Sequence, residues 1–160
     1  MTRILLVCTG NTCRSPMAEA LLLKMLQENS EQIKNEIEIC SAGLYTLNDL
    51  SASPEAIRIM AREGLDITGH RSRILDVSII GQADLILTMS SSHRDEIRER
   101  YPETGPRVYT LGEYAGFAGM DISDPIGGGF EAYQKCVSQL KEILPGVWYN
   151  ITQGQAIRRK

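Results

Sequence analysis

The chain has 160 residues, of which 42% are hydrophobic and 23% are charged, and its formal net charge at pH 7 is −3. This length is typical of a single domain. The small negative charge gives no general basic field for nucleic acid, and no apolar run approaches the ~20 residues of a membrane span. We therefore expect one globular domain over residues 1–150, with no nucleic-acid or membrane partner, followed by a frayed tail over residues 151–160.

The first element that we expect is a short buried strand. The run "RILLVC" at residues 3–8 is almost continuously apolar, as in a strand covered on both faces. Its apolar core, Ile4 to Val7, is shorter than the roughly seven residues of a signal sequence. We therefore interpret it as part of the folded domain and expect a cytoplasmic protein.

The rest of the chain alternates helices with strands. We expect helices over 15–29, 54–63, 76–82, 91–100 and 130–144, and strands over 36–43, 84–89 and 107–111. Ser15 and Ser53 are the expected N-caps, each followed by proline at the first helical position, and Pro145 with Gly146 should end the last helix. This order predicts an α/β fold, Rossmann-like, with a four-stranded parallel sheet and helices on both faces.

The loop after the first strand, "CTGNTCRS" at residues 8–15, has the composition of an oxyanion site. In open α/β sheets, ligands bind beyond the carboxyl ends of the strands, against a helix N-terminus that carries partial positive charge. Gly10 permits a tight turn, and Arg14 offers a bidentate fork to two anionic oxygens. The same field stabilises a thiolate at Cys8, and a thiolate that faces a bound phosphoryl group is a nucleophile.

Two other interpretations of this loop remain open from the residues alone. Cys8 could be an inert core residue, or Cys8 and Cys13 could form half of a zinc site. The second half of a zinc site is not evident, because His70 and His93 are isolated in the sequence. We expect no metal and no cofactor, and we expect Cys40 and Cys136 to be buried packing residues.

The segment "VCTGNTCRSPMAEAL" resembles the signature of the low-molecular-weight protein tyrosine phosphatase family. The resemblance extends to "SAG" at residues 41–43, "HRSR" at 70–73, "ADLILTM" at 83–89 and the pair Asp124-Pro125. It implies the phosphotyrosine protein phosphatase I-like fold and a phosphatase that acts on phosphorylated proteins. The reaction implied proceeds through a phosphocysteine intermediate on Cys8.

The resemblance also implies roles for individual residues. The phosphate-binding loop would comprise Thr9, Gly10, Asn11, Thr12, Cys13, Arg14 and Ser15. An aspartate in "GMDISDP" should protonate the leaving group; the residues alone do not separate Asp121 from Asp124, and the family places this acid in the Asp-Pro pair. Ser15 would donate to Cys8, and Asn11, Ser41 and His70 would fix the loop. Under peroxide, Cys13 would form a reversible disulfide with Cys8.

The loop departs from the tyrosine-directed pattern in two places. Thr12 stands where tyrosine phosphatases usually carry an aliphatic residue, and Ile126-Gly127 replaces the aromatic pair that often follows Asp-Pro. An aromatic substrate would lose stacking worth roughly 0.5–1.5 kcal/mol per pair. These features resemble the bacterial protein arginine phosphatases, so we expect phosphoarginine in proteins as the substrate. Leu44 and Tyr45 should contribute to the rim of the pocket and to its selectivity.

Three alternatives differ in substrate or in reaction. Phosphotyrosine hydrolysis is the main one. Arsenate reductases share the fold and the loop, but they relay electrons through a further mid-chain cysteine pair that this sequence does not contain between Cys40 and Cys136. Phosphocysteine carriers of sugar-transport systems lack the loop arginine, so Arg14 argues against that function.

Overall fold

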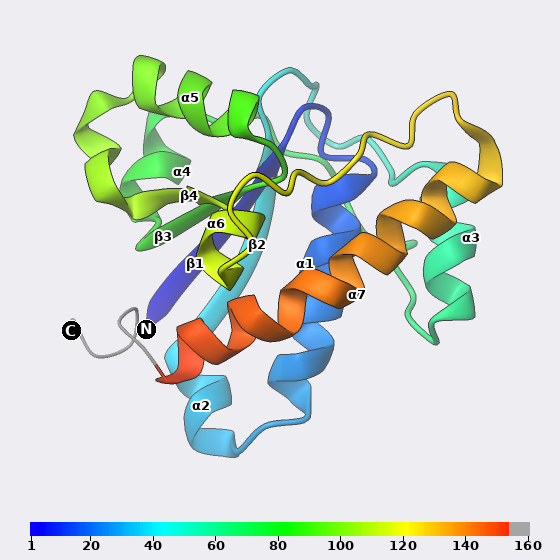
Figure 1. Cartoon of the computed structure of the whole chain (residues 1–160), viewed down its shortest axis with the longest axis horizontal. Coiled ribbons are helices and arrows are strands. Elements are labelled where there is room, and N and C mark those ends of the chain that lie inside the picture. The colour runs from blue at the N-terminus through cyan, green and yellow to red at the C-terminus, as the bar shows by residue number, and fades with distance from the viewer. Residues whose placement is uncertain (154–160) are drawn as a thin grey trace.

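A computed structural model describes residues 1–153 of the chain (Figure 1). The strands are β1 (Thr2–Cys8), β2 (Ile37–Gly43), β3 (Leu85–Thr88) and β4 (Val108–Thr110). The helices are α1 (Arg14–Gln27), α2 (Glu31–Glu36), α3 (Pro54–Arg62), α4 (Val77–Gln82), α5 (Ser91–Arg100), α6 (Leu111–Ala115) and α7 (Gly129–Gln153), with a 3₁₀ segment, η1 (Pro102–Arg107). No helix in this part of the chain has both the length and the apolar character needed to cross a membrane.

The four strands form one sheet in the order β2-β1-β3-β4. All three pairings are parallel, which confirms the predicted α/β fold. The chain leaves β1 toward β2 on one side and later returns to β3 on the other side. The carboxyl end of β1 is therefore the topological switch point, where ligands bind in open α/β sheets.

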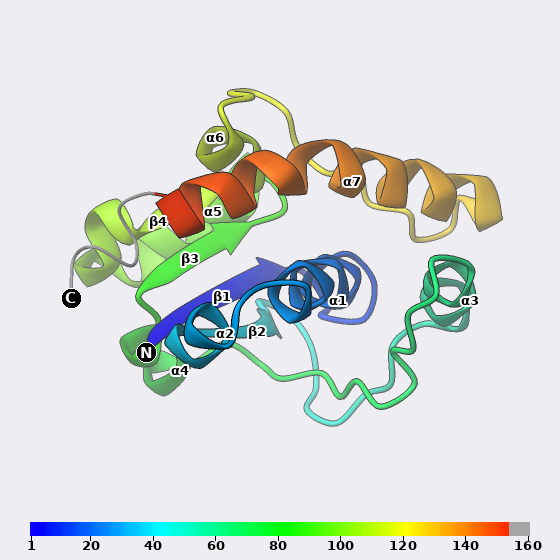
Figure 2. The ribbon, with the colours of Figure 1, turned by 90° about the horizontal axis from the view of Figure 1, so that it is seen from below.

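Each face of the sheet has its own apolar core. Alternate residues of β1 point to opposite faces, so Ile4 and Leu6 pack with α1, α3 and α7, whereas Leu5 and Val7 pack with α4 and α5. The helices thus cover both faces, as expected from a buried parallel sheet. In both views α3 lies beside the start of α7, and this pair flanks the loop that follows β1 (Figures 1 and 2).

The last helix is longer than the sequence predicts. Proline in a helix interior removes a donor and usually breaks the helix, yet α7 continues through Pro145 to Gln153. Packing against α6 stabilises the second half of α7. Gly146 lies so close to α6 that a Cβ there would be 3.0 Å from the carbonyl oxygen of Ala115. The side chain of Asn150 donates to the carbonyl of Tyr114 at 2.7 Å. The predicted helix end at Pro145 is therefore wrong.

The predicted tail also needs correction. Ile151 is fully buried in the core around α1 and α7, so a frayed tail beginning at residue 151 is wrong for residues 151–153. The remainder of that tail, residues 154–160, lies outside the described residues. The short elements α2, α6 and η1 were not predicted, because each is only five or six residues long and such a length shows little periodicity.

Candidate active site

Cys8 is the last residue of β1 and is 2% exposed. Its Sγ lies 2.9 Å from Ser15 Oγ and accepts the backbone N–H of Asn11 at 3.3 Å. Ser15 was predicted to cap α1, but the helix begins at Arg14 and the residue at the cap position is Cys13. Ser15 therefore lies inside the first turn, where its side chain faces the thiol and does not cap the backbone.

Asn11 organises the loop from its centre. Its φ of 56° lies in the left-handed region, which asparagine tolerates better than most residues. Its Nδ2 donates to Ser15 Oγ at 2.8 Å and to Ser41 Oγ at 2.9 Å, while its Oδ1 accepts the Arg73 N–H at 2.9 Å. Since Ser15 Oγ accepts from Asn11, its own proton is directed at Cys8. The side chain of His70 contacts the Asn11 carbonyl at 2.7 Å.

Backbone donors are concentrated in this loop. The N–H groups of Gly10, Thr12 and Cys13 find no acceptor among residues 1–153. The adjoining α1 has no side-chain cap and no acidic residue in its first turn. Such a set of unpaired donors at a helix N-terminus binds an anion, directly beside the thiol of Cys8.

Gly43, at the end of β2, lets the loop approach the sheet. A Cβ at this position would lie 2.8 Å from the carbonyl oxygen of Thr9 and 3.0 Å from the nitrogen of Asn11. These backbone atoms of the loop leave no room for a side chain. The glycine in "SAG" therefore has a steric role in holding the anion loop against β2.

Arg14 connects this loop with the segment before α7. Its side chain is buried, and it donates to the carbonyl of Ile122 at 3.1 Å and to Thr9 Oγ1 at 3.4 Å. Its Nη2 lies 3.6 Å from Asp124 Oδ2. The Asp124 side chain is 49% exposed, so its carboxyl group lies at the entrance of the site.

The structure separates the two candidate aspartates. Asp121 accepts hydrogen bonds from the N–H and hydroxyl of Ser91, both at 3.1 Å, and thereby holds the start of α5. Asp124 pairs with Arg14 and accepts the N–H of Ile126 at 3.1 Å in a local turn. Only Asp124 of this pair contacts a residue of the anion loop.

His93 is a site residue that sequence reasoning missed. It lies in the charged helix α5, and its ring joins Ser90 Oγ at 2.9 Å to Thr9 Oγ1 at 2.8 Å. Burial, together with the charge of Arg14, lowers the pKa of His93 from 6.5 to about 4. Because Thr9 Oγ1 accepts from Arg14, its proton is directed at a neutral His93 ring. Neither periodicity nor spacing in the sequence connects residues 9 and 93.

A cleft of about 400 Å³ opens beside the anion loop. Its lining residues are Thr12, Cys13, Ser53, Glu55, Ile126, Gly127, Gly129 and Tyr133. The thiol of Cys13 lies 3.4 Å from Ser53 Oγ and 3.3 Å from the Tyr133 hydroxyl. Burial raises the pKa of Tyr133 to about 12, so this phenol remains protonated. Two residues predicted to affect selectivity, Thr12 and Ile126, thus line one cleft.

The other two predicted rim residues differ from each other. Leu44 is 3% exposed and packs in the core beneath α4 and α5, so its assignment to the rim is wrong. The next side chain alternates to the opposite side, and Tyr45 is 58% exposed. Its N–H donates to the carbonyl of Thr9 at 2.9 Å, and its ring faces the guanidinium of Arg100 at 4.9 Å. Tyr45 is therefore the accessible aromatic side chain next to the loop.

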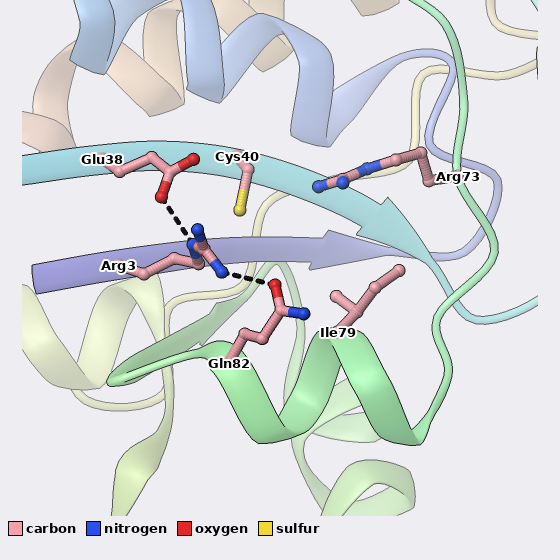
Figure 3. Close-up of a pocket in the computed structure, with 6 residues that line it drawn as sticks. All are labelled: Arg3, Glu38, Cys40, Arg73, Ile79 and Gln82. Atoms are coloured by element: carbon pink, nitrogen blue, oxygen red, sulfur yellow. Dashed lines mark hydrogen bonds and ion pairs between the residues drawn. The ribbon is translucent and has the colours of Figure 1, made fainter.

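The other two cysteines are not part of the anion loop. Cys136 is fully buried, as expected, and burial raises the pKa of its thiol to about 12. Cys40 was also predicted to be buried, but it is only half-buried and lines a small cavity of about 120 Å³. Figure 3 shows Arg73 pointing toward this thiol, and Arg3 bridging Glu38 and Gln82 on the other side of the cavity.

The chemistry that this arrangement supports is nucleophilic attack by sulfur on a bound oxyanion. A hydroxyl group holds the thiol, unpaired backbone amides lie in the same loop, and Arg14 of this loop pairs with Asp124. Within residues 1–153, no three His, Cys, Asp or Glu side chains gather closely enough to hold a metal ion. The fold and the site together identify the protein as a phosphatase that uses a cysteine as its nucleophile.

Comparison with known proteins identifies the family. The family model described as "Low molecular weight phosphotyrosine protein phosphatase" matches residues 3–158. The chain belongs to this family, which acts on phosphorylated proteins.

The relatives include enzymes of two specificities. A protein-arginine-phosphatase of Geobacillus stearothermophilus is 38% identical over 142 residues, covering 89% of this chain and 90% of the relative. A probable low molecular weight protein-tyrosine-phosphatase, EpsP, of Ralstonia nicotianae is 38% identical over 138 residues, covering 86% and 88%. Among solved structures, the YwlE arginine phosphatase in a cysteine-to-serine variant with a phosphorylated active-site serine has a TM-score of 0.88 and 29% identity, covering 98% of this chain and 99% of that one.

Proposed function

We propose that the chain is a protein-arginine phosphatase, which hydrolyses phosphoarginine in proteins through a phosphocysteine on Cys8. The observation that carries the substrate assignment is the position of Thr12. It lines the cleft beside the anion loop together with Ile126 and two glycines, and its hydroxyl has only the Cys13 thiol, at 3.8 Å, as a partner within residues 1–153. That hydroxyl is free to hydrogen-bond a nitrogen of a guanidinium leaving group.

The same cleft offers little to an aromatic leaving group. Among the described residues that line it, the single aromatic one is Tyr133, which is 3% exposed and has its hydroxyl directed at Cys13 and Ser53. A phosphotyrosine ring would gain no stacking on this side. The glycine-rich segment leaves room for a non-aromatic, polar group.

In the first chemical step, the thiolate of Cys8 attacks phosphorus and the bond from phosphorus to the leaving nitrogen breaks. The loop amides and Arg14 neutralise the charge on the phosphoryl oxygens. Asp124, at the entrance of the site, gives its proton to the leaving group. The product of this step is phosphocysteine and the released arginine side chain.

In the second step, Asp124 takes a proton from water while the water oxygen attacks phosphorus. The bond between phosphorus and sulfur breaks, and the sulfur leaves as a thiolate. The proton that Ser15 directs at Cys8 stabilises the sulfur as it leaves. Asn11, with Ser41 and His70, keeps the loop in position through both steps.

A second function, phosphotyrosine hydrolysis, is favoured by one observation. Tyr45 is exposed and adjoins the anion loop through its bond to Thr9. Its ring could form an aromatic wall on the side of the site opposite to the cleft. The two functions therefore differ in which side of the site receives the leaving group.

The deciding experiment compares phosphoarginine and phosphotyrosine at the same position of one peptide. We expect the wild type to have a higher kcat/KM for phosphoarginine and Thr12→Val, which removes the hydroxyl at nearly constant shape, to lose that preference. Thr12→Ser keeps the hydroxyl and should keep the preference. A wild-type preference for phosphotyrosine would overturn the substrate assignment and leave the phosphatase mechanism intact.

We also place the protein in the cytoplasm. The mechanism needs Cys8 as a free thiol, and Cys8, Cys13, Cys40 and Cys136 are all unpaired in the structure. A reducing compartment maintains that state. Fractionation of cells expressing the protein tests this assignment, and recovery outside the cytoplasm would contradict it.

A further inference from the structure

The cleft beside the anion loop contains, among residues 1–153, one charged side chain whose charge is not neutralised. Glu55 lies in the first turn of α3 and lines the cleft with Thr12 and Cys13. It is half-buried, and it forms no hydrogen bond or ion pair with any side chain in the described part of the chain. Arg58, one turn further along α3, does not pair with it.

A structural role explains part of this arrangement. An acidic residue in the first turn of a helix interacts favourably with the helix dipole, and α3 is already capped by Ser53, which accepts the N–H of Ala56 at 3.2 Å. The dipole, however, does not require that the carboxylate face a cleft. Glu31 in α2 occupies the same kind of position and pairs with Lys34 on the surface at 3.0 Å.

The position of Glu55 relative to the loop indicates the charge of the group that it would bind. Ser53 fixes the start of α3 to the loop, because its N–H donates to the carbonyl of Thr12 at 2.9 Å and its Oγ lies 3.4 Å from the Cys13 thiol. The site therefore has a positively charged region and a negatively charged region next to each other. Arg14 and the loop amides attract phosphate, and Glu55 offers negative charge in the adjoining cleft.

We propose that the cleft is a subsite for a basic side chain, lysine or arginine, that neighbours the phosphorylated residue in the substrate protein. Glu55 is the specificity-determining residue of this subsite. The cleft, at about 400 Å³, has room for such a side chain at Glu55 in addition to the leaving group at Thr12. Its carboxylate on Glu55 and its exposed Ile126 match the charged end and the aliphatic stem of a long basic residue. The proposal deepens the proposed function, since it takes the loop after Cys8 as the phosphate site.

The test measures kcat/KM for peptide pairs that differ only in a lysine or a glutamine next to the phosphorylated residue. We expect the wild type to prefer lysine by about two- to fivefold, the range that an exposed ion pair produces, and to lose the preference in 0.5 M salt. Glu55→Gln should abolish the preference and Glu55→Lys should reverse it. Since each value is a ratio for one variant, a general effect of the substitution on activity cancels.

Glu31→Gln is the matched control, because it makes the same change in net charge in the first turn of a distant helix (Figure 1). It should keep the wild-type preference. No preference in the wild type, or one that survives in Glu55→Gln, would overturn the proposal.

The same peptide pairs and variants are measured with phosphoarginine and with phosphotyrosine as the phosphorylated residue. This comparison separates the basic subsite from the proposed arginine-phosphatase function. A lysine preference that depends on Glu55 in phosphotyrosine peptides alone would overturn the assigned substrate and support the subsite.

Discussion

The Nη2 atom of Arg14 lies 3.6 Å from Oδ2 of Asp124, and this ion pair joins the loop after β1 to the segment before α7. Arg14 is buried and also holds the carbonyl of Ile122, two residues before that aspartate. One guanidinium therefore sets the position of the carboxyl group relative to the anion loop. The proposed acid and the anion loop are consequently aligned by a single side chain.

Replacing the acid should affect poor leaving groups most. We expect Asp124→Asn to lower kcat on phosphopeptides by about 10²–10⁴-fold. The loss should be smaller on p-nitrophenyl phosphate, because nitrophenolate leaves without full protonation. Steady-state kinetics with both substrates check this, and Asp121→Asn serves as the control. That variant leaves one acceptor oxygen where Ser91 now donates to two and should cost about 1 kcal/mol of stability without a leaving-group effect. Equal losses of Asp124→Asn on both substrates would contradict the assignment.

Adding a methyl group behind the anion loop should displace it. In Gly43→Ala the new Cβ would meet the carbonyl of Thr9 at 2.8 Å, so we expect a loss of about 1–3 kcal/mol in the free energy of unfolding and a weaker affinity for inorganic phosphate. Urea unfolding and competitive inhibition by phosphate measure the two effects. The control is Gly81→Ala in α4, where a Cβ meets nothing within 4 Å and alanine should be neutral or stabilising. Wild-type behaviour of Gly43→Ala would contradict the close approach.

The buried His93 makes folding stability depend on pH. Its pKa in the folded state is about 4, against 6.5 for an unperturbed histidine. The unfolded chain therefore binds more protons between these values, and stability falls as pH is lowered from 6.5 to 4. The loss is at most about 3 kcal/mol. Urea unfolding at several pH values should show a flatter profile for His93→Gln. A His93→Gln profile identical to that of the wild type would exclude the histidine as its source.

The second loop cysteine should protect the first. The thiol of Cys13 adjoins Ser53 and Tyr133, and we propose that it turns toward Cys8 to form a disulfide when peroxide oxidises the nucleophile. After brief peroxide treatment, a thiol reductant should restore most of the activity of the wild type and much less in Cys13→Ser. Cys40→Ser, at a cysteine outside the loop, should recover like the wild type. Equal recovery of Cys13→Ser and the wild type would exclude protection by Cys13.

Local signals predicted the framework of the molecule well. The apolar run ending at Cys8, the Ser53-Pro54 helix start and the alternation of strands and helices all appear in the structure. These features depend on backbone preference and periodicity within a few residues. The family signature, which is continuous in the chain, likewise indicated the anion loop and its arginine.

Contacts between distant segments decided the remainder. The packing of Gly146 on Ala115 carries α7 past Pro145, and strand alternation at the end of β2 buries Leu44 while exposing Tyr45. The bond between His93 and Thr9, and the position of Glu55 in the cleft, come from the arrangement of α5 and α3 around the loop. The sequence by itself thus determined the fold class, the nucleophile-bearing loop and the family. Only the tertiary structure decided which side chains surround that loop, because burial and charge at a site are summed over neighbours that no local pattern records.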